Sequence, residues 1–272
     1  MLIAVLTQPK VVAVDYSELA TYFIREFNRR CPTEYVKYFS RMGFNQENIL
    51  DANVLFRFMA TLSYDMRPLS YQQVWGPPNH PEFSNNSVKQ ALDQLSIELT
   101  IVERMDESAL WEKLRGKELM VREEKFRMNV HDWKDRGSVD HARGLKELAV
   151  KVKGIAELLK NLRSTGNIEA VYKAVDSIFG FGPALTSKTI LFIVRCLGIG
   201  LAGIDPKNLR IVADGLLNEL VMERRAKRLE AKGVDIQSLV GKMTELGDPL
   251  AIELLYLLDS ERDFKDLLAH VS

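Results

Sequence analysis

The sequence predicts an all-α fold of ten or more helices, because apolar residues recur at helical spacing and alternating strand patterns are almost absent after residue 15. The longest apolar stripe is typical of a core-facing helix, and its members are Leu145, Leu148, Val152, Ile155, Leu159 and Leu162. Shorter stripes predict further helices, at Leu19, Phe23 and Phe27, at Leu50, Val54, Phe58 and Leu62, and at Val88, Leu92, Leu95, Leu99 and Val102. Proline and glycine are expected to end helices, at Pro32, Pro68, Gly76-Pro77-Pro78, Gly137, Gly166, Gly233 and Gly247-Asp248-Pro249.

The chain is long enough for one domain with two lobes, since it has 272 residues. We expect an N-terminal helical region over 1–135 and a second helical region over 136–272, packed as one compact unit. The apolar start of the chain lacks a basic segment and is interrupted by Pro9, so it is expected to form a short strand or hairpin over 1–15 rather than a signal peptide. The polar, proline-rich residues 76–87 are expected to form a loop. The densely charged segment 103–137 is expected to form a solvated helix face.

Charge and cysteine content exclude several classes of protein. The 37 basic and 37 acidic side chains cancel, so histone-like binding of nucleic acid through bulk positive charge is excluded. Cys31 and Cys196 lack the spacing of a zinc or iron–sulfur site, and the four histidines show no metal-ligand spacing. We therefore expect no metal, no cofactor and reduced thiols in the cytoplasm. No run reaches the roughly 18 apolar residues of a membrane helix, so no membrane partner is expected. The chain is also expected to be a monomer.

The most informative stretch runs from residue 168 to 197 and predicts a helix, a tight turn and a second helix. The turn is Phe179-Gly180-Phe181-Gly182, and Pro183 then takes the favoured first position of a helix. Two glycines around one residue allow a sharp bend whose amides, at the positive end of a helix dipole, can bind a phosphate oxygen. The alternative is an ordinary corner between two helices with a glycine turn.

Phe179 to Thr186 resembles the hairpin of helix-hairpin-helix DNA-binding proteins. With its all-helical context, the chain resembles the helix-hairpin-helix DNA glycosylases and abasic-site lyases, a superfamily that includes endonuclease III and the archaeal 8-oxoguanine glycosylases. The resemblance covers about 40 positions, residues 168 to 212, and the archaeal group is the most similar. It implies two helical lobes around the hairpin and binding of double-stranded DNA that carries a damaged base or an abasic site, through Gly180, Phe181, Gly182 and Ala184.

The resemblance also implies a catalytic lysine and an aspartate. The usual lysine position, two after the second glycine, is Ala184 here. Lys188 lies one turn later on the same helix face, about 5.4 Å along the axis, and the string around it resembles the lysine-containing helix of the archaeal group. Its neutral amine would form a Schiff base with the opened deoxyribose and cleave the strand by β-elimination. The alternative for Lys188 is a surface lysine that contacts phosphate or solvent.

Asp205 is the candidate aspartate, 17 residues after Lys188, and the Pro206 that follows makes it a candidate helix N-cap as well. Asp214 is a second candidate, within a helix. Lys207 and Arg210 could contact flanking phosphates, as could two basic stretches, one with Lys146, Lys151, Lys153, Lys160 and Arg163 and one with Arg224, Arg225, Lys227, Arg228 and Lys232. A solvated helix face without a ligand is the alternative for such stretches.

The sequence thus predicts a base-excision repair enzyme, a DNA glycosylase or abasic-site lyase, or both. Two alternatives remain: a non-catalytic helix-hairpin-helix module that binds DNA, and a helical scaffold for other proteins in which the two glycines have no ligand.

Overall fold

The computed structural model describes residues 14–65, 92–114, 118–121, 124–127, 140–199, 203–258 and 264–267. Helices dominate these residues, which confirms the all-α class. They are α1 (Tyr16–Arg41), α2 (Ala52–Asp65), α5 (Leu99–Arg104), α6 (Glu107–Leu114), α7 (Asp140–Thr165), α8 (Ile168–Asp176), α9 (Pro183–Leu191), the π-helix η2 (Phe192–Cys196), α10 (Pro206–Leu216), α11 (Leu220–Glu230), α12 (Ile236–Glu245), the 3-10 helix η3 (Pro249–Glu253) and α13 (Leu254–Leu257).

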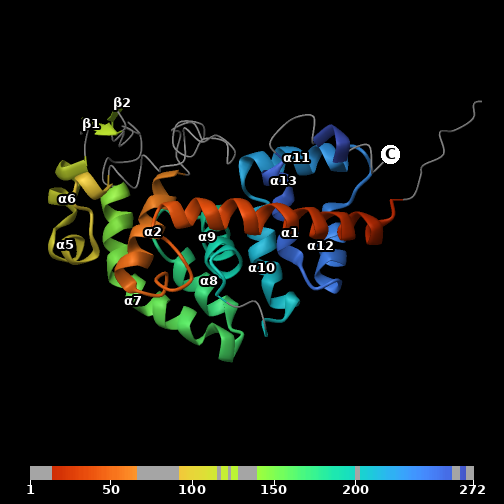
Figure 1. The fold of residues 1–272 in the computed structure, drawn as a ribbon, viewed down its shortest axis with the longest axis horizontal. Coiled ribbons are helices and arrows are strands. Elements are labelled where there is room, and N and C mark those ends of the chain that lie inside the picture. Colours follow the sequence, from red (N-terminus) through yellow and green to blue (C-terminus); the bar gives the residue numbers. More distant parts are fainter. Residues whose placement is uncertain are drawn as a thin grey trace, which may run out of the picture.

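The long helix α1 runs along the length of the molecule (Figure 1) and packs against η2 and the C-terminal elements α12, η3 and α13. The expected stripe Leu19, Phe23 and Phe27 is buried, and Cys31, Tyr35 and Phe39 extend it. The helix continues through Pro32, so the prediction that this proline ends a helix is wrong. A proline costs one intrahelical hydrogen bond, and the apolar face buried on both sides of Pro32 outweighs that loss.

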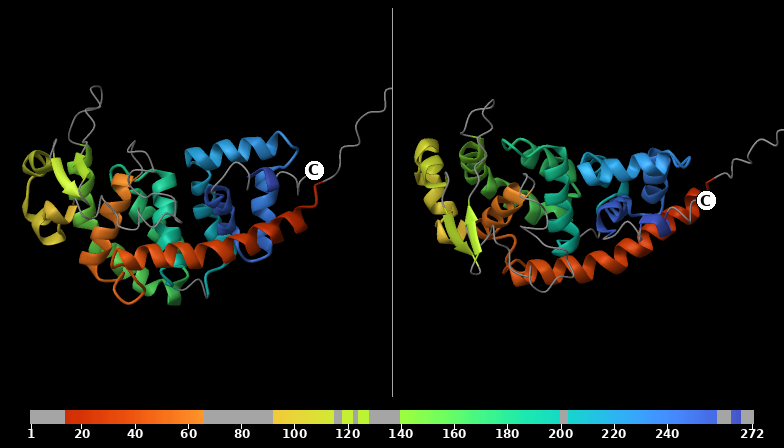
Figure 2. Two further views of the ribbon diagram at one scale, coloured as in Figure 1. Left: turned by 45° about the horizontal axis from the view of Figure 1, so that its top comes forward. Right: turned by 90° about the horizontal axis from the view of Figure 1, so that it is seen from above.

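The helix α7 buries its whole predicted stripe, from Leu145 to Leu162, and packs against α2, α5, α6 and α8. In the two views of Figure 2, α7 lies near α2, while α11 to α13 lie toward the other end of α1. Buried apolar side chains from α1 to α13 form one continuous core. The first helix therefore shares its core with the last ones, across the predicted boundary at residue 135.

Two predicted features of secondary structure are wrong. Residues Glu118–Val121 (β1) and Glu124–Arg127 (β2) pair as antiparallel strands, where the charge pattern indicated a helix face. Strands of four residues are too short for alternation to stand out from a helical charge pattern. The stripe that ends at Val102 is also interrupted, because Ser96 has a φ of 51° and α5 begins only at Leu99.

The ends of three other helices agree with the sequence. α7, α11 and α12 stop one to three residues before Gly166, Gly233 and Gly247, all of which have positive φ. Residues 1–13, Pro68, the predicted loop 76–87 and Gly137 lie outside the described residues.

Two cysteines that are distant in sequence meet in the core. Cys31 on α1 and Cys196 in η2 are both buried, with their Sγ atoms 3.0 Å apart. Burial, and then the neighbouring Cys31 thiol, raise the pKa of Cys196 well above its ordinary value. Cys196 is therefore a thiol packed within the core.

Candidate functional site

The bend between α8 and α9 is built by a buried helix face and one buried aromatic ring. α8 begins at the cap Asn167, whose side chain accepts from the Ala170 N–H, and buries Ile168, Val171, Tyr172 and Val175. In the bend, Phe181 is buried and its N–H donates to the Ile178 carbonyl. Gly180, Gly182 and Pro183 around it are exposed, and Gly180 has a φ of +87°, which favours glycine. Only the main chain of Phe181 can therefore face a ligand.

The exposed side of this bend carries main-chain N–H groups with no acceptor. Pro183 opens α9 at its first position, as predicted, and Gly182 offers no capping side chain. The first N–H bonded within the helix belongs to Thr186, which donates to the Gly182 carbonyl at 2.9 Å. The N–H groups of Gly182, Ala184 and Leu185 find no acceptor among the described residues. A helix N-terminus in this state can bind an anion.

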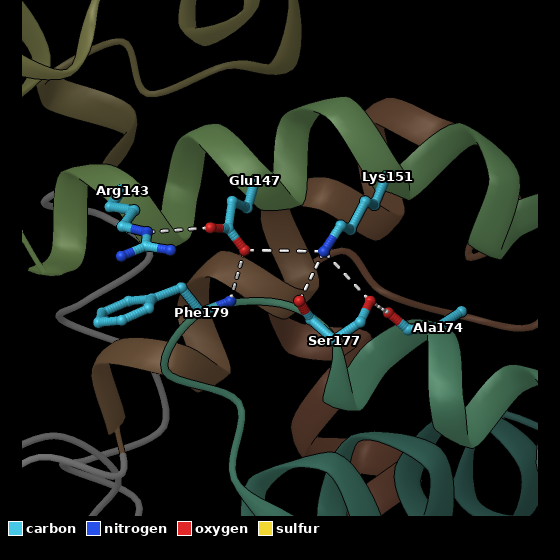
Figure 3. A network of polar contacts seen from close by, with 6 residues as sticks. All are labelled: Arg143, Glu147, Lys151, Ala174, Ser177 and Phe179. Carbon is cyan, nitrogen blue, oxygen red and sulfur yellow. Dashed lines mark hydrogen bonds and ion pairs between the residues drawn. The ribbon is translucent and has the colours of Figure 1, made fainter.

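Three charged side chains of α7 hold the bend in place (Figure 3). Glu147 accepts from the Phe179 N–H at 2.8 Å and from Arg143 at 3.0 Å. Lys151 donates to the carbonyl and hydroxyl oxygens of Ser177 and lies 3.6 Å from Glu147. The Arg143 guanidinium stacks over the Phe179 ring, 4.3 Å from its centroid. The chain entering the bend is therefore fixed on α7, while the amides that follow stay exposed.

Arg143, Glu147 and Lys151 thus form a clamp that holds the bend on α7. The Glu147 carboxylate should make the free energy of unfolding that this clamp contributes depend on pH. Burial raises the pKa of Glu147, but hydrogen bonds from Phe179 and Arg143 and the charge of Lys151 outweigh burial and lower it below 4.5. A lowered folded-state pKa contributes stability that is present above pH 4.5 and lost as the pH falls through the folded value. We expect Glu147→Gln to reduce the free energy of unfolding at pH 7 by about 1 kcal/mol. Urea titrations should show this difference shrinking below pH 4.5; a difference that is constant with pH would contradict the ionised clamp.

A close backbone contact between α7 and the bend gives a second prediction. A Cβ atom at Gly144 would lie 2.7 Å from the Phe179 carbonyl oxygen, whereas one at Gly154 on the same helix meets nothing within 4 Å. We expect Gly144→Ala to lower the free energy of unfolding by about 2 kcal/mol relative to Gly154→Ala, because the bend must move away from α7. Both variants gain the same helix propensity, so equal stability in urea would rule out the contact.

Lys188 lies six residues after Gly182 on α9 and is buried, with 5% of its surface exposed. The alternative of a surface lysine is therefore wrong. Its Nζ lies 3.5 Å from the ring centroid of Tyr256 on α13, a cation–π contact. The nearby carboxyl of Glu253 is also fully buried. Ala184, where the resemblance to helix-hairpin-helix glycosylases would imply a lysine, is half-buried at the exposed end of the helix.

The residues that face Lys188 are fixed by two arginines. Arg195 of η2 forms an ion pair with Asp248 at 2.6 Å, at the start of η3, and its guanidinium also lies 4.5 Å from the Phe27 ring centroid. Arg225 of α11 donates to the Leu255 carbonyl at 2.6 Å. Both ends of the segment that carries Glu253 and Tyr256 are thereby tied to other helices.

The structure does not bring Asp205 and Lys188 together. Asp205 caps α10 as predicted, accepting from the Lys207 N–H at 2.9 Å, and is exposed. Gly215, ten residues later at the other end of α10, is the residue that packs against Pro183 and Ser187. Asp205 thus lies about 15 Å along α10 from the level of Ser187. The second candidate, Asp214, is exposed and 3.8 Å from Arg210.

Most predicted phosphate-contacting side chains already have partners in the protein. Arg210 donates to Gln237 at 2.7 Å, while Lys207 is exposed at the far end of α10. On α7 all five basic residues make contacts, Lys146 with Val102 and Glu103, Lys151 with Ser177, Lys153 with Glu103, Lys160 with Glu157 and Arg163 with Gly198. These five side chains therefore already have partners within the protein, and Lys151 alone of them touches the bend.

The residues that sequence analysis missed are Arg143 and Glu147 beside the bend, and Glu253 and Tyr256 beside Lys188. The spacing of Arg143, Glu147 and Lys151 by four residues signals one helix face, but does not identify what that face meets. An isolated glutamate within the apolar run 249–258 was the available signal for Glu253.

Comparisons with known proteins identify no relative: no protein family, curated protein or solved structure matches the chain. In the described part of the chain, no group of three or more His, Cys, Asp or Glu side chains could hold a metal ion. None of the described helices combines the length and apolarity needed to cross a membrane.

Proposed function

We propose that the chain binds double-stranded DNA at the α8–α9 bend and acts there in base-excision repair, as a DNA glycosylase, an abasic-site lyase or both. The bend and its two flanking helices would be a helix-hairpin-helix motif between two helical lobes. In the proposed reaction the Lys188 amine forms a Schiff base with the C1′ aldehyde of the opened deoxyribose and releases water. β-Elimination then cleaves the strand.

One observation carries the proposal. An exposed helix N-terminus with three unbonded N–H groups and a buried amine lie on the same nine-residue helix. Six residues of helix separate Gly182 from Lys188, about 9 Å along the axis. Reaction with a sugar beside a phosphate bound at the bend requires the amine to leave its buried contact with Tyr256. Main-chain N–H groups bind phosphate without base contacts, which suits a chain with no net charge.

A non-catalytic DNA-binding module is the second candidate. The burial of Lys188 and the presence of Ala184 at the lysine position of the similar family favour it. Borohydride trapping on DNA with an abasic site tests the choice, since a Schiff base is reduced to a stable covalent adduct. An enzyme should form an adduct that depends on Lys188, whereas a module should bind the same DNA and never be trapped.

A further inference from the structure

Glu253 is a buried acidic residue close to Lys188 that has no role in the reaction proposed above. It ends η3, and none of its surface is exposed. No main-chain N–H and no cationic side chain of the described residues donates a hydrogen bond to its carboxyl oxygens. The Tyr35 hydroxyl of α1 is the polar group that approaches it. A carboxylate in such a place is costly unless a nearby charge compensates it.

Lys188 is the positive charge that acts most strongly on Glu253. The two side chains do not form an ion pair, and the amine rests on the Tyr256 ring at 3.5 Å from its centroid. A cation–π contact holds an ammonium group less tightly than a direct ion pair in a buried site. The amine is therefore placed near a carboxyl group without being locked to it.

We propose that Glu253 accepts the proton that Lys188 must lose before its amine can attack the sugar. The inference rests on the proposed function. In this step the ammonium and the carboxylate become a neutral amine and a carboxylic acid, so one proton moves and the total charge is unchanged. Glu253 acts through Lys188 and is a positioning residue, since it need not touch the DNA.

The electrostatic surroundings of Glu253 suit this role. Burial, with a smaller contribution from Glu219, raises the pKa of Glu253 to about 8. The Lys188 charge and the Tyr35 hydroxyl act in the opposite direction and lower it. The buried Cys196 thiol also lies within electrostatic range. Once ionised, above about pH 8, a group with this pKa is a stronger base than an ordinary carboxylate and can take a proton from an amine.

The test is the pH dependence of borohydride trapping on abasic-site DNA, measured as an initial rate between pH 6 and 9 with the full chain. Glu253→Gln keeps the shape of the protonated acid, so the variant should fold. We expect equal rates for the two proteins at pH 6, where Glu253 is protonated. The wild-type rate should then rise through about pH 8 and exceed the variant rate about tenfold at pH 9. A merely structural role would lower the rate by one factor at every pH.

Glu219→Gln provides a matched variant. Glu219 caps α11 by accepting from the Val221 and Met222 N–H groups, and glutamine keeps an acceptor oxygen at that place. Because Glu219 raises the pKa of Glu253, its neutralisation should move the rise in trapping rate to lower pH. The proposal is overturned if Glu253→Gln retains the wild-type pH profile. If the wild-type chain forms no adduct at any pH, the proposed lyase function itself fails. That result differs from an adduct whose pH profile does not depend on Glu253, in which case only the role of Glu253 fails.

Unfolding in urea supplies a readout that does not depend on DNA. A raised folded-state pKa contributes stability that is fully present below the unfolded value of 4.5 and is lost as the pH rises through about 8. Wild type should therefore lose stability relative to Glu253→Gln between these pH values and stay parallel to it above them. A constant difference would show that folding does not raise the pKa of Glu253, so that its carboxylate is no stronger a base than an ordinary one, and would overturn the proposal.

Discussion

Lys188→Gln is expected to abolish the borohydride-trapped adduct on abasic-site DNA, by roughly a thousandfold or more, because loss of the nucleophile removes the covalent route. Glutamine cannot form a Schiff base, yet it keeps the length of most of the side chain within the buried contact to Tyr256. Strand cleavage should fall with the adduct, while binding to an uncleavable duplex should stay close to wild type. Gel mobility of the trapped complex and mass spectrometry of the labelled peptide would measure both the amount and the attachment site.

The matched control is Lys160→Gln on α7. Lys160 is exposed and pairs with Glu157 at 2.6 Å, so its loss should change neither folding nor trapping. Circular dichroism of both variants should match wild type. An adduct that persists in Lys188→Gln would assign the chemistry to another amine, and wild-type protein that binds without being trapped would favour the non-catalytic module.

Gly182→Val is expected to weaken duplex binding at least tenfold, since it places two methyl groups beside the amides proposed to bind phosphate. The backbone at Gly182 is extended, with a φ of −76° and a ψ of 176°, so a β-branched residue fits it without strain. A Cβ atom there meets nothing within 4 Å. The variant should therefore fold normally, which separates impaired DNA binding from loss of the fold.

Fluorescence anisotropy at two ionic strengths would measure this effect. Because main-chain N–H groups carry no net charge and the slope of log affinity against log salt counts phosphates neutralised by Lys or Arg, the variant should lose affinity by a similar factor at both ionic strengths. Gly154→Ala, on an open face of α7, should bind as wild type does. Unchanged affinity in Gly182→Val would remove the bend from the interface, and a wild-type chain without salt-dependent binding would favour the protein scaffold.

The sequence alone predicts the bend and the helix that carries Lys188, but not which distant residues surround Lys188. The bend was predicted with its exposed glycines and its leading proline, because turn chemistry depends on neighbouring residues. Lys188 was placed on the same helix, but its burial could not be predicted. Tyr256 and Glu253, which surround it, lie more than 60 residues away in the sequence. Asp205 was predicted correctly as a cap, yet Gly215, at the other end of α10, is the residue that packs against Ser187, which separates Asp205 from Lys188.

The sequence by itself determined the helical class, the ends of several helices and the α8–α9 bend, since helical periodicity, glycine and proline act over a few residues. Tertiary structure alone decided that α1 continues through Pro32, that Cys31 meets Cys196 and that α7 clamps the bend through Glu147. It also decided that a lysine and a glutamate share one buried site. The physical reason is that these outcomes depend on the free energy of burial and on charges brought together from distant segments, which no local pattern encodes.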